Sequence, residues 1–282
     1  MPRAGLRSHP SNLIRLAPAK GGELVPRALT IATSDSGGGA GIQADLKAFA
    51  AAGCHGSSVL VALTAQSTVA VTAVHELPDD FVIAQLDAVF DDIGVDAAKT
   101  GMLFSRRLIA LVADYLEPRR PPLVVDPVMI ASSGAQLLQD DAVEMLVARL
   151  FPLATVVTPN LAEAEALTGR AGAPRRELAE RLVDLGAPAA IVTGGHGDTA
   201  VDHLFDGREH HEIPVARHDV RATHGAGCTH SATLAALLAH GRSVPEAAAA
   251  AAHAASEAVR NGLVEIGAGE GPVDVLNVKG AA

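Results

Sequence analysis

Short apolar runs typical of β-strands alternate along this chain with longer runs whose apolar residues recur every three or four positions. The strand-like runs cover 28–33, 58–63, 95–99, 123–126, 155–158 and 189–193, and the helix-like runs cover 42–52, 80–92, 105–116, 140–150, 161–167 and 175–185. Such alternation predicts an α/β fold in which a mainly parallel central sheet carries helices on both faces, giving three α/β/α layers.

The C-terminal part of the chain departs from this alternation. Two strand-like runs, 201–205 and 210–215, flank Asp206-Gly207 and predict a hairpin. Helices are expected over 226–239 and 245–261. No linker divides the chain after residue 28, so we expect a single domain over 28–282.

Residues 1–27 differ in character from the rest. They are basic, contain one acidic residue, Glu23, and show no long periodic pattern. They also lack the apolar core of a secretory signal. We expect them to form a disordered N-terminal extension.

Composition excludes several classes of function. The net charge is −10 and only 2% of residues are aromatic, which argues against nucleic-acid binding. No uncharged run reaches the roughly 18 apolar residues of a membrane span. The two cysteines, Cys54 and Cys228, form no disulfide framework, so a cytoplasmic location fits best.

Polar and glycine residues follow several of the predicted strands. They stand at 33–35, 65–68, 99–101, 126–127, 158–160 and 193–196. Because open parallel sheets bind ligands at the carboxyl ends of their strands, we expect these residues to share one rim and to form the active site there.

The stretch 223–231, Thr-His-Gly-Ala-Gly-Cys-Thr-His-Ser, runs from a glycine loop into an apolar helix. Free backbone N–H groups and the helix dipole make such a start a seat for an anion. Cys228 then lies near a helix N-terminus, where a thiol pKa tends to fall and a thiolate can act. This stretch alone equally fits a glycine-capped packing helix with Cys228 as a core residue.

A second glycine loop, 34–41, enters a helix after the first strand. Four glycines within Gly37–Gly41 exceed what a turn needs, which favours a role in enclosing a ligand over a simple strand–helix turn. The loop does not complete a dinucleotide G-x-G-x-x-G fingerprint, and the chain contains no Walker A lysine.

Asn160 and Glu163 lie three residues apart at the start of a short helix. Glu163 could hold a hydrated Mg²⁺, with Asp126 at a neighbouring strand end as a second candidate. The same spacing is that of a helix capping box, which spacing alone favours. Lys99, at an apolar strand end, fits a satisfied structural lysine better than a phosphate ligand.

The ordered set of these stretches resembles the hydroxymethylpyrimidine/phosphomethylpyrimidine kinases of thiamine biosynthesis, in the ribokinase-like superfamily. The resemblance covers about 28–275 and rests on 28–41, Ala65-Gln66, Lys99-Thr100-Gly101-Met102-Leu103, Val125-Asp126-Pro127-Val128-Met129, 158–165, Gly194-Gly195-His196 and 224–229, with Glu265-Ile266-Gly267 and Gly271-Pro272-Val273 in the tail. It implies an enzyme of ribokinase-like fold that uses ATP and Mg²⁺. The expected reactions phosphorylate 4-amino-5-hydroxymethyl-2-methylpyrimidine and then its monophosphate.

The resemblance also implies roles for individual residues. Gly225, Ala226 and Gly227 would form an anion hole for the transferring phosphoryl group, and Cys228 would be the general base. The pyrimidine pocket would contain Gln66, Asp45, Met102 and Val128. Glu163 and Asp126 would hold the metal, and ATP would contact Asn160, Gly194, Gly195 and Thr223.

Three positions depart from the family pattern. Thr193 stands where many relatives have lysine, Ser132 where they often have lysine or threonine, and His230 where leucine is common. The remaining alternatives are a pyridoxal/pyridoxine kinase and a catalytically silent pyrimidine- or nucleotide-binding protein. The resemblance further suggests a homodimer that binds small molecules only.

Overall fold

A mostly parallel sheet of nine strands forms the centre of the computed structural model, which describes residues 24–129, 140–194 and 200–281. The strand order is β3-β2-β1-β4-β5-β6-β7-β8-β9. Strands β2, β1, β4, β5, β6 and β7 run parallel, whereas β3, β8 and β9 join as antiparallel strands at the two edges. The strands are β1 (Arg27–Asp35), β2 (His55–Gln66), β3 (Val71–Glu76), β4 (Ala97–Thr100), β5 (Leu123–Val125), β6 (Val156–Val157), β7 (Ala190–Val192), β8 (Val201–Phe205) and β9 (His210–Pro214).

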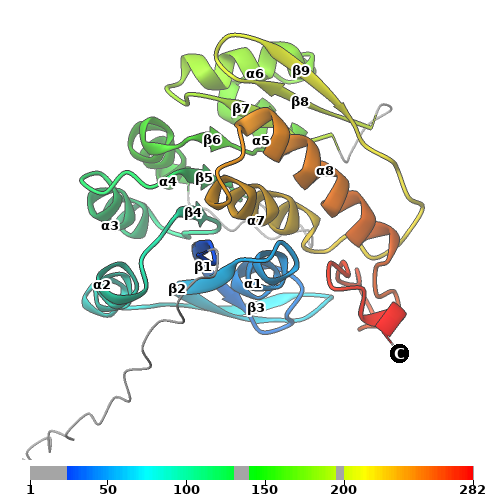
Figure 1. Cartoon of the computed structure of the whole chain (residues 1–282), viewed down its shortest axis with the longest axis horizontal. Coiled ribbons are helices and arrows are strands. Elements are labelled where there is room, and N and C mark those ends of the chain that lie inside the picture. Colours follow the sequence, from blue (N-terminus) through cyan, green and yellow to red (C-terminus); the bar gives the residue numbers. More distant parts are fainter. Residues whose placement is uncertain (1–23, 130–139, 195–199, 282) are drawn as a thin grey trace, which may run out of the picture.

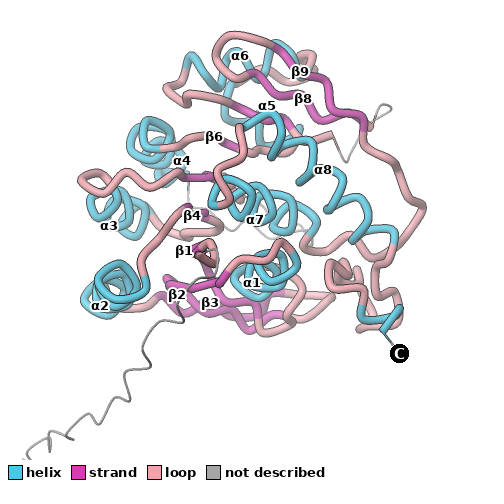
Figure 2. Tube along the Cα trace, in the orientation of Figure 1, coloured by secondary structure: helices cyan, strands magenta, loops and turns pink. Residues whose placement is uncertain are grey.

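Helices cover both faces of this sheet (Figure 1). The α-helices are α1 (Gly41–Ala51), α2 (Asp79–Ala88), α3 (Arg106–Leu116), α4 (Asp140–Met145), α5 (Leu161–Thr168), α6 (Arg175–Asp184), α7 (Ala226–Ala239) and α8 (Val244–Arg260). Helices α1, α7 and α8 lie on one side, and α2, α3 and α4 lie on the other (Figures 1 and 2). None of the helices in the described part of the chain is long and apolar enough to cross a membrane.

Alternation of side chains within the strands explains why both faces need a cover. In β5, Leu123 and Val125 belong to the core under α2, α3 and α6, whereas Val124 belongs to the core under α1, α7 and α8. All three side chains are almost completely buried. A strand that is apolar on both faces is stable only between two layers, which is the physical basis of the α/β/α arrangement.

The structure confirms the predicted fold class and corrects several details. Strand β2 extends to Gln66 and pairs with β3, an edge strand that the sequence pattern did not reveal. The helices expected over 80–92 and 140–150 end in short π-helical turns, η1 (Val89–Ile93) and η2 (Leu146–Leu150). Short 3₁₀ turns follow at η3 (Phe151–Leu153) and η4 (Val278–Ala281).

The expected N-terminal extension ends earlier than predicted. Arg27 is the first residue of β1, and its guanidinium pairs with Asp96 at 2.6 Å. This pairing fixes the entry of the chain into the sheet beside β4. Residues 1–23 lie outside the described residues, so their disorder stays a prediction, as does the single-domain assignment.

A buried ion pair joins helix α1 to the central strand β4. Lys99 Nζ lies 2.6 Å from Asp45 Oδ1, and both side chains are 0% exposed. The second carboxylate oxygen of Asp45 accepts a hydrogen bond from Thr30 Oγ1 on β1 at 2.6 Å. The polar groups of the pair are thus satisfied where water cannot reach them, as a buried charge requires.

The lysine also faces the next strand end along the sheet. Its Nζ lies 3.6 Å from Asp126 Oδ2, and the same oxygen accepts a bond from Ser231 Oγ of α7 at 2.8 Å. Lys99 therefore fits the structural role predicted from sequence. Burial alone would lower its pKa, but the carboxylates of Asp45 and Asp126 raise it, so the ammonium is charged.

We expect Lys99→Met to lower the free energy of unfolding by about 3–5 kcal/mol, because it leaves the Asp45 carboxylate buried without a counter-charge. The double variant Lys99→Met/Asp45→Leu should recover much of this loss. Urea denaturation monitored by circular dichroism measures both. Arg176→Met, which breaks an exposed pair with Glu180, is the control and should change stability by less than about 1 kcal/mol. Equal losses of unfolding free energy in Lys99→Met and Arg176→Met would contradict this account.

Candidate active site

The two glycine loops, far apart in sequence, meet at the carboxyl ends of the parallel strands. Gly225 has a φ of +85°, and a Cβ there would overlap the carbonyl oxygen of Gly39. A Cβ on Gly39 would in turn overlap the His224 ring. Glycine is therefore required at both positions for this contact. The contact brings the start of α7 against the loop that follows β1.

Asp35, the last residue of β1, organises the first loop. Its carboxylate accepts backbone hydrogen bonds from Gly37 at 2.7 Å, Gly39 at 3.1 Å and Ala40 at 2.9 Å. Burial alone would raise the pKa of Asp35, but the bonds from His224, Ala40 and Gly37 outweigh it and lower the pKa. Sequence reasoning gave Asp35 no role. An acidic residue directly before a glycine turn was the available signal, because aspartate readily bonds backbone N–H groups just ahead of it.

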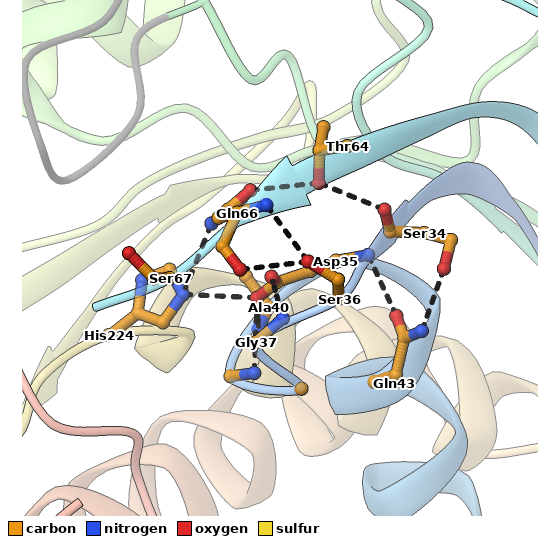
Figure 3. A network of polar contacts seen from close by, with 12 residues as sticks. Ser34, Asp35, Ser36, Gly37, Ala40, Gln43, Thr64, Gln66, Ser67 and His224 are labelled. Carbon is orange, nitrogen blue, oxygen red and sulfur yellow. Dashed lines mark hydrogen bonds and ion pairs between the residues drawn. The ribbon is translucent and has the colours of Figure 1, made fainter. Parts of the chain in front are cut away.

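Gln66 and His224 approach each other across the same loop (Figure 3). Gln66 Nε2 lies 3.4 Å from His224 Nε2, which in turn lies 3.2 Å from Asp35 Oδ2. Ser36 Oγ bonds both the backbone N–H and the backbone carbonyl of Gln66 at 2.8 Å. The backbone of Gln66, which is predicted to bind the pyrimidine, is thus hydrogen-bonded to the glycine loop. His224 is a site residue to which sequence reasoning assigned no role of its own.

The anion-seat prediction is sharpened by the start of α7. Gly225 is the N-cap in a left-handed conformation, and the Ala226 N–H already donates to the Thr223 carbonyl at 3.1 Å. Gly227 and Cys228 lie in the first helical turn, where a backbone N–H has no acceptor four residues back within the helix. These two N–H groups are the donors that the geometry favours for an anion.

Cys228 differs from expectation in its acidity. Burial and the neighbouring Asp45 and Asp126 raise the pKa of the thiol to about 12, although Lys99 and a hydrogen bond from the Gly41 N–H oppose this rise. The expected fall at a helix N-terminus is therefore wrong for this cysteine. The two buried carboxylates and the loss of hydration outweigh the helix dipole and one ammonium group. The side chain is partly exposed and remains a thiol at neutral pH.

Glu163 and Asp126 form a second group of carboxyl side chains on the rim. Glu163 and Asn160 make a capping box: Asn160 Oδ1 accepts from the Glu163 N–H at 3.0 Å, and Glu163 Oε2 accepts from the Asn160 N–H at 2.9 Å. The other oxygen, Oε1, accepts from the Met129 N–H at 3.3 Å. Burial and the nearby Asp126 raise the pKa of Glu163 to about 8. The cap is confirmed, and a buried carboxyl near a second one would be stabilised by a cation.

The four residues predicted to bind ATP differ in their local contacts. Asn160 caps α5. The N–H of Gly194 donates to Asp202 at 2.5 Å, and a Cβ at Gly194 would overlap the Val201 carbonyl, so close packing against β8 already requires this glycine. The Thr223 carbonyl accepts a hydrogen bond from the Ala226 N–H. Gly195 lies outside the described residues, and the ATP contacts of all four stay predictions.

The remaining predicted pocket residues lie at different depths. Asp45 is completely buried, and both of its oxygens are engaged, so its geometry supports holding Lys99 rather than touching a ligand. Met102 is 9% exposed, and its carbonyl accepts from Thr33 Oγ1 at 3.0 Å. Val128 is half-buried just beyond β5. Substrate contact by these three residues stays a prediction.

The structure describes two of the three residues that depart from the family pattern, His230 and Thr193. His230 is 4% exposed, with Nε2 3.6 Å from Asp202 Oδ2, and neither ring nitrogen has a hydrogen-bond partner among the described residues. Burial lowers the pKa of His230 and keeps the ring neutral. Thr193 continues β7 and pairs with Asn160 across an isolated bridge. Ser132 lies outside the described residues.

Comparison with known proteins places these features in context. A family model described as phosphomethylpyrimidine kinase matches residues 35–274. A hydroxymethylpyrimidine/phosphomethylpyrimidine kinase of Rhizobium meliloti (strain 1021) is 51% identical over 255 residues, which cover 87% of this chain and 95% of the relative.

Two solved structures are also similar. The phosphomethylpyrimidine kinase of Clostridium difficile 630 has a TM-score of 0.72 and 40% identity, and the match covers 80% of this chain and 96% of that one. The ADP complex of a Bacillus subtilis pyridoxal kinase has a TM-score of 0.82 and 36% identity, with 91% and 99% coverage.

We expect Gly225→Ala to destabilise the protein by at least about 1–3 kcal/mol, because it combines a left-handed φ with overlap against Gly39. Gly227→Ala is the matched control: a Cβ there meets nothing within 4 Å, so stability should change by no more than about 1 kcal/mol. Thermal and urea unfolding provide the comparison. Equal stabilities of the two variants would show that the loop contact is not a constraint on the fold.

Proposed function

The chain belongs to the phosphomethylpyrimidine kinase family, and we propose that it phosphorylates 4-amino-5-hydroxymethyl-2-methylpyrimidine and then its monophosphate, using ATP. The observation that carries this proposal is the meeting of the two glycine loops. That meeting brings the first turn of α7, the Cys228 thiol and the Gln66 amide to one rim of the sheet, where the first turn would bind an anion. A phosphoryl group, a hydroxyl group and a ring with hydrogen-bonding edges match these three features.

The start of α7 would stabilise the transferring phosphoryl group. Phosphoryl transfer depends mainly on positioning and on electrostatic stabilisation of the equatorial oxygens. The N–H groups of Gly227 and Cys228 and the positive end of the α7 dipole provide this stabilisation without reorganisation. The new bond joins the acceptor oxygen to phosphorus as the bond to the leaving ADP oxygen breaks.

Cys228 would orient the acceptor hydroxyl rather than wait as a preformed thiolate. With a pKa of about 12, only a very small fraction of molecules carries a thiolate at neutral pH. In a loose transition state the hydroxyl proton leaves late, when the oxygen is already bonding to phosphorus. The thiol would guide the hydroxyl until that point. Because its sulfur already carries a proton, the hydroxyl proton would pass to an oxygen of the transferred phosphoryl group as the new bond to phosphorus forms.

The carboxyl groups fit a hydrated Mg²⁺. Burial and the nearby Asp126 raise the pKa of Glu163, and no group of three or more metal-ligating side chains occurs in the described residues. Mg²⁺ usually keeps several waters and takes one or two carboxylates together with substrate phosphates, which suits so few protein ligands. When bound, it would neutralise phosphate charge.

The acceptor would lie between Gln66 and Cys228, with Met102 and Val128 as apolar neighbours. The loop 36–40 would cover it and exclude water. The homodimeric state and the cytoplasmic location stay predictions.

Pyridoxal is a second candidate acceptor, because a pyridoxal kinase is among the similar solved structures at 36% identity. The proposed pocket contains groups that any small hydroxymethyl-substituted ring could use. A silent binding protein is disfavoured, because the chain retains Cys228, both glycine loops and Glu163.

We expect Cys228→Ala to lower turnover at least 100-fold, because the acceptor hydroxyl loses its hydrogen-bonding partner. The assay is Mg-ATP-dependent ADP release with the hydroxymethylpyrimidine, its monophosphate, pyridoxal, or no acceptor. Cys54→Ala is the control. Cys54 is buried just beyond the C-terminal end of α1, away from the proposed site, and its thiol donates to the Ala236 carbonyl. Full activity of Cys228→Ala would exclude the assigned role. Turnover on pyridoxal alone would identify pyridoxal, and not the pyrimidine, as the substrate.

We expect Glu163→Gln to raise the half-saturating Mg²⁺ concentration about tenfold while preserving the fold, because glutamine keeps an acceptor for the cap but has no charge. Glu165→Gln, on the same helix, is the control and should leave the Mg²⁺ requirement unchanged. ADP release over a Mg²⁺ titration, with urea unfolding in parallel, gives both quantities. An unaltered requirement in Glu163→Gln would leave Glu163 a capping residue only.

A further inference from the structure

Beside the Gln66 amide, one hydroxyl group faces two acceptors but has only one proton to donate. Thr64 Oγ1 lies 3.0 Å from the Ser34 carbonyl oxygen and 3.1 Å from Gln66 Oε1 (Figure 3). Both of those oxygens can only accept, yet a threonine hydroxyl has a single proton. One of the two contacts is therefore left without a hydrogen.

A second conflict lies at the other end of the amide. His224 Nε2 faces the Asp35 carboxylate at 3.2 Å, and this contact requires a proton on Nε2. The Gln66 NH₂ group, which can only donate, faces the same nitrogen at 3.4 Å. With the amide in this orientation, two donors oppose each other.

Rotating the Gln66 amide by 180° removes both conflicts. Its NH₂ group then donates to Thr64 Oγ1, which is free to donate to the Ser34 carbonyl. Its carbonyl oxygen then accepts from the His224 Nε2–H, which Asp35 shares. The two ends of an amide have nearly the same size, so this rotation needs no additional space.

We propose that His224, held by Asp35, and Thr64 together fix the Gln66 amide with its oxygen toward His224 and its NH₂ group toward Thr64, which makes His224 a positioning residue for acceptor recognition. This inference rests on the proposed function, in which Gln66 contacts the acceptor ring. His224 acts through the glutamine, and not on the reacting atoms.

The fixed amide presents one remaining N–H and one remaining lone pair in a set order. A ring nitrogen beside an exocyclic amine offers the complementary acceptor and donor, as the 4-aminopyrimidine edge does. Pyridoxal has no such amine. His224 would thus favour an aminopyrimidine over a ring that has only acceptors on that edge.

Two further features support a fixed orientation. The Gln66 backbone is bonded on both sides by Ser36, so the side chain starts from a fixed position. The His224 ring lies so close to Gly39 that a Cβ there would overlap it, and its side chain is only 13% exposed. The ring therefore has little freedom to turn away from Asp35 and Gln66.

A double-mutant cycle with His224→Leu and Gln66→Ala tests the coupling. The acceptors are the hydroxymethylpyrimidine and its analogue that lacks the 4-amino group. We expect His224→Leu to lower kcat/KM for the amino compound about tenfold, mainly through KM, with little change for the analogue. In the Gln66→Ala background, His224→Leu should have no further effect. Additive losses, or equal losses on both acceptors, would overturn the proposal.

Variants at Thr64 test the other end of the amide. Thr64→Val should reduce the preference for the amino compound in the same way, and Thr64→Ser should restore it. An unchanged preference in Thr64→Val would contradict the assigned orientation.

The orientation itself can be tested without turnover. In the labelled wild-type protein, nuclear Overhauser effects from the Gln66 side-chain NH₂ protons should reach Thr64 and not the His224 ring. Contacts to the ring would reject the orientation. If the wild type phosphorylated neither pyrimidine, the proposed function would fail and the recognition role with it, whereas these contacts would still decide the amide orientation.

Discussion

The buried ion pair between Asp45 and Lys99 is the interaction on which the site depends. It lies where neither side chain has any exposed surface, so each charge needs the other and its hydrogen bonds to exist there. Thr30, Asp126 and Ser231 complete these contacts. They tie β1, α1, β4, the end of β5 and α7 to one point. That point lies beneath the start of α7 and sets its electrostatic environment.

Cys228 shows how this buried array alters a local rule. A cysteine in the first turn of a helix ordinarily gains acidity from the dipole. Here burial and the carboxylates of Asp45 and Asp126 raise the thiol pKa to about 12 against the single charge of Lys99. The group that the sequence offers as a ready thiolate is a thiol in the folded protein. The role proposed for it is therefore to orient a hydroxyl group.

The glycine loops contribute in a different way, through close approach of their backbones. Gly225 and Gly39 touch without side chains between them, and this contact carries His224 toward Asp35 and Gln66. A loop after the first strand and a loop before α7 thereby form one wall of the site. The same contact joins the proposed anion seat at the start of α7 to His224, Asp35 and Gln66.

The sequence by itself determined the layered α/β architecture and the positions of nearly all helices and strands, and it predicted the site at the carboxyl rim. Strand and helix periodicities and glycine positions are local properties, and parallel strands necessarily end on one edge. The edge strand β3 escaped prediction because its half-exposed residues lack an apolar pattern.

Only the tertiary structure decided the charges and partners within the site. The Asp45–Lys99 pair joins residues 54 positions apart, and the His224–Asp35 contact joins residues 189 apart. The pKa values of Cys228 and Glu163 follow from such neighbours. No local pattern encodes which charges a fold brings together, because burial and distance exist only once the layers have packed.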